Sequence, residues 1–293
     1  MKRVKRMITI IGVALVLNGC TSWMKKPVNT LVLAKPLTAN VDIQIQLVRI
    51  NQILSSGKKL TPSVAAKLFY ERGMTYDAMG LNALALMDFR HSLGINPIQP
   101  EIFNVLGIYY TQVGRFTDAY DAFDSVIDLD PKHPYAYRNR GIALYYGKRI
   151  SLAIETFSQG YAKHPDDPFS LIWLYLAMAQ KDPYQAHQYL VTEYKKVAKE
   201  EDPGWLLVPL LIDDASDTDI LRGYEVAAKS ERNLAYHLCE IYFYIAKREQ
   251  LKGHIDTAKQ YFKLALMTHV MPYLEHRYAT LELNQIANKI TKR

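Results

Sequence analysis

The chain has 293 residues, of which 49% are hydrophobic and 22% charged, a composition typical of a soluble, globular protein. Its formal net charge is +7, but four of the basic residues lie among the first six positions. Without them the charge is +3, which leaves little support for nucleic-acid binding.

Residues 1–19 are predicted to be a secretory signal peptide. Lys2, Arg3, Lys5 and Arg6 form a positive segment, an apolar run follows at residues 7–17, and Gly19 precedes Cys20. Eleven apolar residues are too few to span a bilayer as a helix, which needs about 20. A cleaved signal is therefore expected rather than an anchor helix.

The junction Leu17-Asn18-Gly19-Cys20 resembles the lipobox of bacterial lipoproteins. This resemblance implies cleavage before Cys20 and acylation of that residue, and several acyl chains hold a protein on a membrane more firmly than one. Asn18 departs from the preferred Ala or Ser, and an ordinary signal peptide with an incidental cysteine is the alternative. Cys20 is followed by Thr21 and not by Asp. In this the chain resembles bacterial lipoproteins that are sorted to the outer membrane. With Cys20 lipidated, Cys239 has no partner, so no internal disulfide is expected.

Residues 20–40 contain Pro27 and Pro36 and little periodicity, and are interpreted as the lipidated cysteine and a tether. An amphipathic helix is predicted over residues 41–54, with one apolar face formed by Ile43, Leu47, Ile50 and Leu54. This helix is expected to cover the open face of the first repeat, either within the chain or from a second copy.

One pattern then recurs three times with a period of 34 residues, in units at about 66–99, 100–133 and 134–167. The recurring positions are Gly73, Gly107 and Gly141, Ala85, Ala119 and Ala153, Phe89, Phe123 and Phe157, and Pro97, Pro131 and Pro165. Small residues at the Gly and Ala positions let two helices approach closely, and the Pro ends the second helix. Each unit is therefore predicted to be a helix, a turn and a helix.

The pattern resembles the tetratricopeptide repeat, and the second unit carries its signature at Phe103, Leu106, Gly107, Tyr110, Gly114, Ala119, Phe123 and Pro131. The first and third units depart from it with Arg72 and Arg140, where the family prefers Leu. The predicted fold is accordingly an all-α tetratricopeptide-repeat solenoid with additional N- and C-terminal helices.

After Pro165 the pattern weakens. A degenerate unit is predicted at 168–199, and irregular helices follow to residue 223, with the clustered Asp213, Asp214, Asp217 and Asp219 expected to cap helices rather than bind a metal. A further unit is predicted at 239–272 from Gly253, Ala258, Phe262 and Ala265. The repeat domain is placed at 41–293, and its last helix, residues 273–289, is expected to cap the array.

No enzymatic constellation is present in the sequence. There is no His-Glu-x-x-His, no Gly-x-Ser-x-Gly and no phosphate-binding glycine loop. His237 and Cys239 lie in a predicted helix, where packing is favoured over metal binding. We therefore expect a protein without catalytic activity, cofactor or metal.

Stacked helix pairs build a concave groove that binds peptides or partner surfaces. Counting along the first helix of each unit predicts the following groove residues: Tyr70, Met74, Asp77, Asn104, Ile108, Thr111, Gln112, Tyr135, Arg138, Ile142, Tyr145 and Tyr146. Packing against the next repeat is an equally favoured role for Tyr145 and Tyr146.

Taken together, the lipobox, the tether and the segments LFYERG from Leu68, FNVLGIYYTQVGRFTDAYDAFDSVIDLDP from Phe103, NRGIALYYGKR from Asn139 and EHRYATLEL from Glu275 resemble the NlpI lipoprotein family of gamma-proteobacteria. That resemblance implies an outer-membrane, periplasm-facing homodimer without nucleic-acid partners. Family members bring peptidoglycan hydrolases, notably endopeptidases, together with the tail-specific protease Prc, and so regulate hydrolase turnover and cell division. A structural assembly lipoprotein for outer-membrane or pilus proteins is the alternative, and a tethered enzyme is a third possibility.

Overall fold

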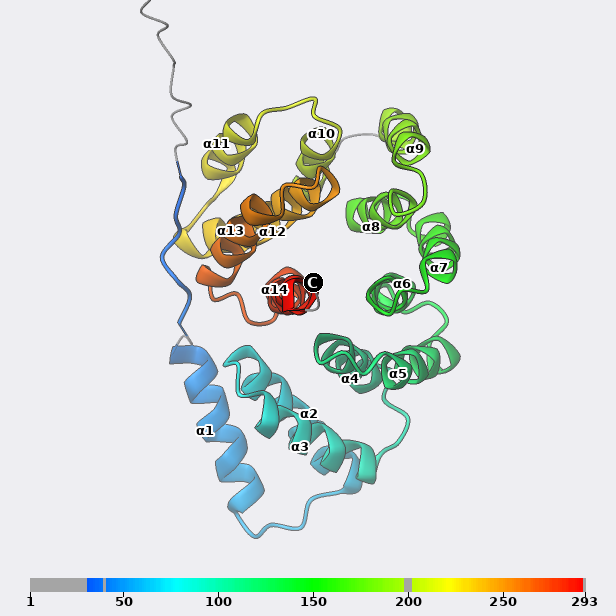
Figure 1. Cartoon of the computed structure of the whole chain (residues 1–293). Coiled ribbons are helices and arrows are strands. Elements are labelled where there is room, and N and C mark those ends of the chain that lie inside the picture. The colour runs from blue at the N-terminus through cyan, green and yellow to red at the C-terminus, as the bar shows by residue number, and fades with distance from the viewer. Residues whose placement is uncertain (1–30, 39–40, 198–201, 292–293) are drawn as a thin grey trace, which may run out of the picture. The chain divides into compact units, whose positions relative to one another are not determined.

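The computed structural model describes residues 31–38, 41–197 and 202–291, and all regular structure in these ranges is helical (Figure 1). The all-α prediction is thus confirmed. The signal peptide, Cys20 and most of the predicted tether lie outside the described residues. Within the described ranges, every helix is too short or too polar to cross a bilayer.

The helices follow one another in pairs joined by short turns. Their bounds are α1 Val41–Ser55, α2 Pro62–Ala78, α3 Asn82–Ile95, α4 Pro100–Gln112, α5 Phe116–Leu129, α6 Ala136–Tyr146, α7 Ile150–Lys163, α8 Pro168–Met178, α9 Pro183–Lys196, the 3-10 helix Pro203–Leu206, α10 Leu207–Leu211, α11 Asp217–Ala227, α12 Glu231–Leu251, α13 Ile255–Met267 and α14 Leu274–Thr291. The five pairs that correspond to the predicted units are α2/α3, α4/α5, α6/α7, α8/α9 and α12/α13, and in each pair the two helices contact each other.

The repeating glycine lies directly under the repeating phenylalanine. A Cβ atom placed on Gly73, Gly107 or Gly141 would come within 2.5 to 2.6 Å of the ring of the Phe sixteen residues later. The rings of Phe89, Phe123 and Phe157 are fully buried. Gly253 plays a different part, because it lies in the turn between α12 and α13 with φ of +82°, as Gly114 does with φ of +78° between α4 and α5. The alanines of the pattern, Ala85, Ala119, Ala153 and Ala258, are buried, and so is Phe262.

Arginine replaces leucine in two units without leaving its charge unpaired. The Arg72 guanidinium donates to the Asp88 carboxylate at 2.6 and 2.8 Å, and Arg140 donates to Asp124 at 2.6 Å and to Thr156 at 3.1 Å. Asp88 and Thr156 each lie sixteen residues after the arginine they bind. A polar contact between the two helices therefore takes the place of the apolar one.

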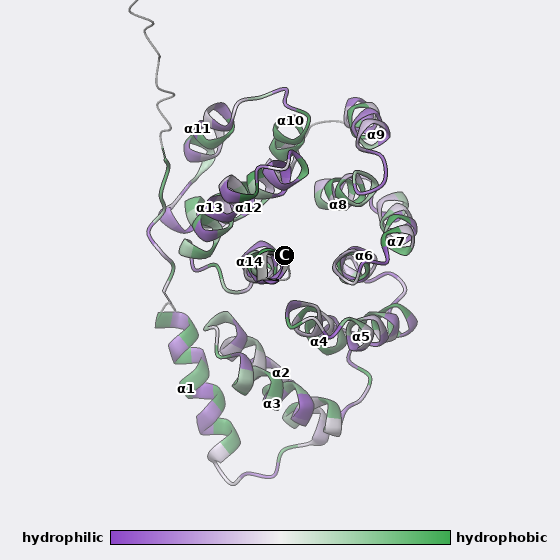
Figure 2. Cartoon of the chain, in the orientation of Figure 1, coloured by the Kyte–Doolittle hydropathy of each residue, from purple (hydrophilic) through white to green (hydrophobic). Residues whose placement is uncertain are grey.

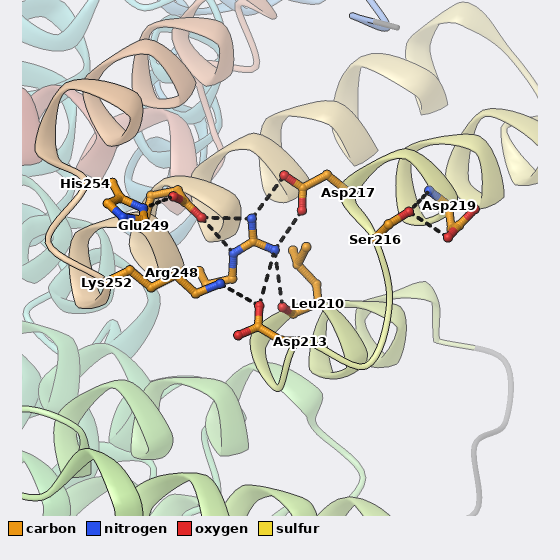
Figure 3. Close-up of polar contacts among 9 residues, drawn as sticks. All are labelled: Leu210, Asp213, Ser216, Asp217, Asp219, Arg248, Glu249, Lys252 and His254. Carbon is orange, nitrogen blue, oxygen red and sulfur yellow. Dashed lines mark hydrogen bonds and ion pairs between the residues drawn. The ribbon is translucent and has the colours of Figure 1, made fainter. Parts of the chain in front are cut away.

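Asp213 and Asp217 of the predicted capping cluster bind basic side chains in α12 and just after it (Figure 3). The Asp217 carboxylate accepts from both terminal nitrogens of Arg248 at 2.7 and 3.0 Å, and Asp213 accepts from Lys252 at 2.6 Å. Helix α11 is capped by Ser216, whose hydroxyl accepts from the Asp219 amide at 3.1 Å. Asp217 thus lies in the first turn of α11, as expected for a helix start, and also binds Arg248 of α12, whereas Asp213 lies in the turn after α10 and caps no helix.

Residues 32–37 differ from the expected tether. The amide of Leu37 donates to the carbonyl of Thr268 at 3.0 Å, and the hydroxyl of Tyr242 donates to the carbonyl of Val32. Val32 and Ala34 pack against the main apolar core. This segment belongs to the folded body, next to α12 and the end of α13, because its apolar residues bury there and its backbone finds partners.

Candidate functional site

Half of the twelve predicted groove residues are buried. Thr111 and Ile142 are fully buried, and Asp77, Asn104, Tyr145 and Tyr146 are buried as well. The prediction of an open groove is therefore wrong for Asp77, Asn104, Thr111 and Ile142, whereas Tyr145 and Tyr146 pack against Trp173 of the next pair, which is the alternative role expected for them. Tyr70, Ile108, Gln112 and Arg138 are half-buried, and Met74 and Tyr135 are exposed.

The last helix accounts for part of this burial. Helix α14 contacts α4, α12 and α13, and its side chains meet inner-face residues of the repeats. The Arg277 guanidinium donates to both oxygens of the Asp77 carboxylate, at 2.7 and 2.6 Å, across 200 residues of sequence. The ring of Tyr278 lies 5.3 Å from that of Tyr146, centroid to centroid. The helix expected to cap the end of the array thus packs against the inner face itself.

A second buried ion pair joins α12 to α14. The ammonium of Lys247 donates to the carboxylate of Glu282 at 2.5 Å and to the hydroxyl of Tyr145 at 3.1 Å. The same carboxylate accepts from Tyr146 at 2.9 Å and from the Gln250 amide at 2.8 Å. Burial alone would lower the pKa of Lys247, but the adjacent carboxylate outweighs it and raises that pKa to about 12. Burial would likewise raise the pKa of Glu282, but the nearby ammonium keeps it below its usual value.

Arg138 forms an ion pair within the chain, so its guanidinium is not free to bind another protein. Its Nη1 donates to both carboxylate oxygens of Asp167 at 2.9 Å, and its guanidinium lies over the rings of Tyr135 and Phe169. Asp167 also caps α8 by accepting from the Phe169 amide at 3.0 Å. An alanine at Arg138 would therefore disturb the junction of the third and fourth pairs as well as any partner contact.

Two hollows are lined in part by residues of α14. The first, here called the lysine pocket, has a volume of about 300 Å³ and is lined by Tyr145, Lys148, Gln180, Lys247, Gln250, Leu251, Ile255, Glu282, Gln285 and Ile286. The second, here called the amide groove, has a volume of about 590 Å³ and is lined by Gln112, Val113, Gly114, Phe116, Thr280, Leu281, Asn284, Gln285, Ala287 and Asn288. Of the predicted groove residues, Tyr145 lines the first and Gln112 the second.

Sequence reasoning missed most of this site. Lys247, Gln250, Glu282 and Gln285 lie outside the three regular repeats, and their proximity depends on where α14 packs. The carboxamides Asn284, Gln285 and Asn288 are close together in the sequence, but polar residues are ordinary on the outer side of a helix that covers a core, so they gave no signal of a site. Cys239 is a free, buried thiol, and burial raises its pKa well above the ordinary value, as expected for a packing residue.

Comparison with known proteins supports the repeat assignment. A family model described as "Tetratricopeptide repeat" matches residues 66–99. A tetratricopeptide repeat protein from Parabacteroides merdae is similar at 16% identity, with a TM-score of 0.48, over 74% of this chain and 78% of that one. The C-terminal part of a repeat-containing protein from Cytophaga hutchinsonii shares 18% identity, with a TM-score of 0.44, over 76% of both chains. PilF of Pseudomonas aeruginosa shares 18% identity, with a TM-score of 0.43, over 75% of this chain and 99% of that one.

Identities and scores this low carry no functional argument. The assignment depends instead on the matched unit at 66–99 and on the helix pairs with buried Gly-Phe contacts that continue after it. These observations identify the chain as an all-α protein built on tetratricopeptide repeats, a fold suited to binding other proteins.

Proposed function

We propose that the chain is a non-enzymatic adaptor, anchored through Cys20 in the outer membrane and facing the periplasm, that binds peptidoglycan hydrolases together with the tail-specific protease Prc. The repeat fold and the resemblance to the NlpI family support this proposal. The observation that carries it is the pair of hollows beside α14. They provide a concave surface on which other proteins can bind, and the sequence of this helical array contains no catalytic constellation.

An adaptor of this kind acts by raising local concentration. Two partners bound to the same adaptor encounter each other at an effective concentration of up to about millimolar, and no new chemistry is needed. The lipid anchor confines the encounter to the membrane surface. Because residues 32–37 pack on the body, the chain between Cys20 and Leu31 could extend by at most about 40 Å, which keeps the body near that surface.

A second copy is part of the proposal. The helix α1 buries Ile50 but leaves Val41, Ile45, Val48 and Ile53 exposed, and hydrophobic residues alternate with hydrophilic ones along it (Figure 2). The exposed fraction of the Val48 side chain is 55%. The family resemblance implies a homodimer, and the second copy would cover this exposed apolar face.

Depletion of the protein from its cell tests the adaptor role. We expect a cell-wall hydrolase to accumulate because its delivery to the protease is lost, and quantitative immunoblotting of the periplasm measures it. A control strain expresses the chain with Cys20→Ser, which removes the acylation site. Normal hydrolase levels with loss of outer-membrane barrels or pili would instead support the assembly alternative.

A further inference from the structure

The buried charges that line the lysine pocket cancel each other. The side chains of Lys247 and Glu282 are only 2% and 5% exposed, and they form an ion pair. Lys148 also lines the pocket, but it is exposed and already interacts with another residue, so water screens its charge. The pocket therefore presents a neutral, sheltered floor rather than a site for an ion.

Two hydrogen-bond donors of this floor have no acceptor among the described residues. The Lys247 ammonium has three N–H groups, and Tyr145 and Glu282 accept from two of them. The Tyr145 hydroxyl accepts from Lys247 at 3.1 Å and from the Gln180 carboxamide at 3.4 Å, and its own proton is donated to none of the described side chains. Because a buried donor without an acceptor is unfavourable, the floor favours a ligand that offers oxygen atoms.

Three carboxamides from distant parts of the chain line the same pocket. Gln180 lies in the turn after α8, Gln250 in α12 and Gln285 in α14. Gln250 donates to Glu282 at 2.8 Å, which leaves its carbonyl oxygen and second N–H for a ligand. A carboxamide both donates and accepts, as a hydroxyl group does, so a small molecule with several hydroxyls meets a partner from each of the three elements.

The rest of the lining is aliphatic, and the pocket is small. Leu251, Ile255 and Ile286 supply apolar surface on which C–H groups can pack. The volume of about 300 Å³ is at the lower end of the range for ligand sites and suits one six-membered ring with its substituents. A sugar ring meets both conditions, because hydroxyls surround it and its faces carry C–H groups.

A planar aromatic ligand, such as a nucleobase, finds no stacking partner here. Tyr145 is the aromatic residue of the lining, and its ring packs edge-to-face against the rings of Tyr146 and Trp173. The Lys247 ammonium lies 4.8 Å from the centroid of the same ring. These neighbours occupy the positions from which an aromatic ligand would stack on Tyr145.

We propose that the lysine pocket binds one ring of a neutral sugar, with the hydroxyls on the three carboxamides and the polar floor and the C–H groups on the aliphatic wall. A charged sugar is disfavoured, because Lys247 and Glu282 already neutralise each other and a further buried charge has no partner. This inference goes beyond the proposed adaptor function and does not depend on it.

Ligand-observed saturation-transfer nuclear magnetic resonance tests it, with the soluble chain that starts after Cys20. The probes are glucose, N-acetylglucosamine, protonated glucosamine and adenosine. We expect both neutral sugars to bind with millimolar dissociation constants, and protonated glucosamine to bind at least about fivefold more weakly. No transfer to either neutral sugar, or tighter binding of adenosine, would overturn the inference.

A free sugar and the end of a glycan carry the same chemistry, and a longer probe separates them. If the tetramer of N-acetylglucosamine binds as tightly as the monomer, the pocket accepts the end of a glycan. If the monomer binds and the tetramer does not, the ligand is a free sugar. Both results support a sugar site.

A carboxamide variant locates the site. Gln285→Leu removes one carboxamide of the lining and should weaken N-acetylglucosamine at least about fivefold. Gln188→Leu, at an exposed carboxamide of α9 outside the lining, is the matched control and should leave binding unchanged. Circular-dichroism melting checks that both variants fold. Equal binding by the two variants would show that the sugar does not occupy the lysine pocket.

A charge variant tests the neutrality of the pocket. Ile255 is 40% exposed and begins α13, where the helix dipole favours a carboxylate. Ile255→Glu should weaken N-acetylglucosamine and strengthen protonated glucosamine, so that the ratio of their dissociation constants shifts by at least about tenfold. Val226→Glu on α11, at a side chain 81% exposed, should leave that ratio unchanged. An unchanged ratio in Ile255→Glu contradicts the site, and because neither the hydrolase nor the protease is present, this failure is distinct from a failure of the adaptor proposal.

Discussion

The glycine that recurs every 34 residues sets the distance between the two helices of a unit. Replacing Gly107 by Ala would put a Cβ atom 2.6 Å from the Phe123 ring. The added atom should lower the free energy of unfolding by about 1–3 kcal/mol, despite the better helix propensity of alanine. Urea unfolding followed by circular dichroism measures the change.

Gly94 provides the matched control because a Cβ at this α3 position meets nothing within 4 Å. Gly94→Ala should raise the free energy of unfolding by about 0.5–1 kcal/mol. Equal effects of the two substitutions would contradict the role assigned to the repeating glycine.

His276 should make the protein sensitive to mild acid. Burial lowers the pKa of its ring to about 4, and its Nε2 lies 3.2 Å from the carbonyl of Leu266. Between the ordinary value near 6.5 and about 4, the unfolded chain binds a proton that the folded chain excludes, so stability falls as the pH drops through this window. His276→Gln keeps a donor and should flatten that part of the curve.

The measurement is the free energy of unfolding at several pH values from 7 to 4. Burial raises the pKa of the neighbouring Glu275, which acts in the opposite direction, but this residue is present in both proteins and its effect cancels in the difference. Parallel curves for the two proteins would show that His276 is accessible to protons in the folded chain.

At the scale of one element, α14 decides how much of the inner face is open. Arg277→Met would leave the Asp77 carboxylate buried without its cation, which should cost about 3–5 kcal/mol of stability. Lys259→Met on α13 is the control, since its partner Asp256 is 91% exposed, and no measurable change is expected. The urea midpoints of the two variants and the unaltered protein measure the change in stability. A small effect of Arg277→Met would mean that this ion pair does not hold α14 in place.

The sequence predicts the helix pairs well because their contacts are local. A glycine and the phenylalanine sixteen residues later belong to one hairpin, and the 34-residue period repeats the same packing problem three times. Asp77 and Arg277 are 200 residues apart, and no period relates them. The inner face was therefore predicted to be open, and the hollows beside α14 were visible only in three dimensions.

For the whole molecule, self-association depends on surface that a single chain leaves uncovered. Light scattering of the soluble form that starts after Cys20 should give twice the mass of one chain. Changing Ile45 and Val48 of α1 together to Glu should give the mass of one chain, because both side chains lie on the exposed apolar face. Val226→Glu should leave the mass unchanged, and a monomeric unaltered protein at micromolar concentration would refute the dimer.

The adaptor account is tested most directly by reconstitution. Purified soluble chain, Prc and a peptidoglycan endopeptidase are mixed, and the loss of intact endopeptidase is followed over time at increasing amounts of the chain. The account predicts that degradation accelerates, passes through a maximum and then slows, because excess adaptor binds the two partners separately. Degradation that does not respond to the chain, or cleavage of cell-wall material by the chain alone, would contradict it.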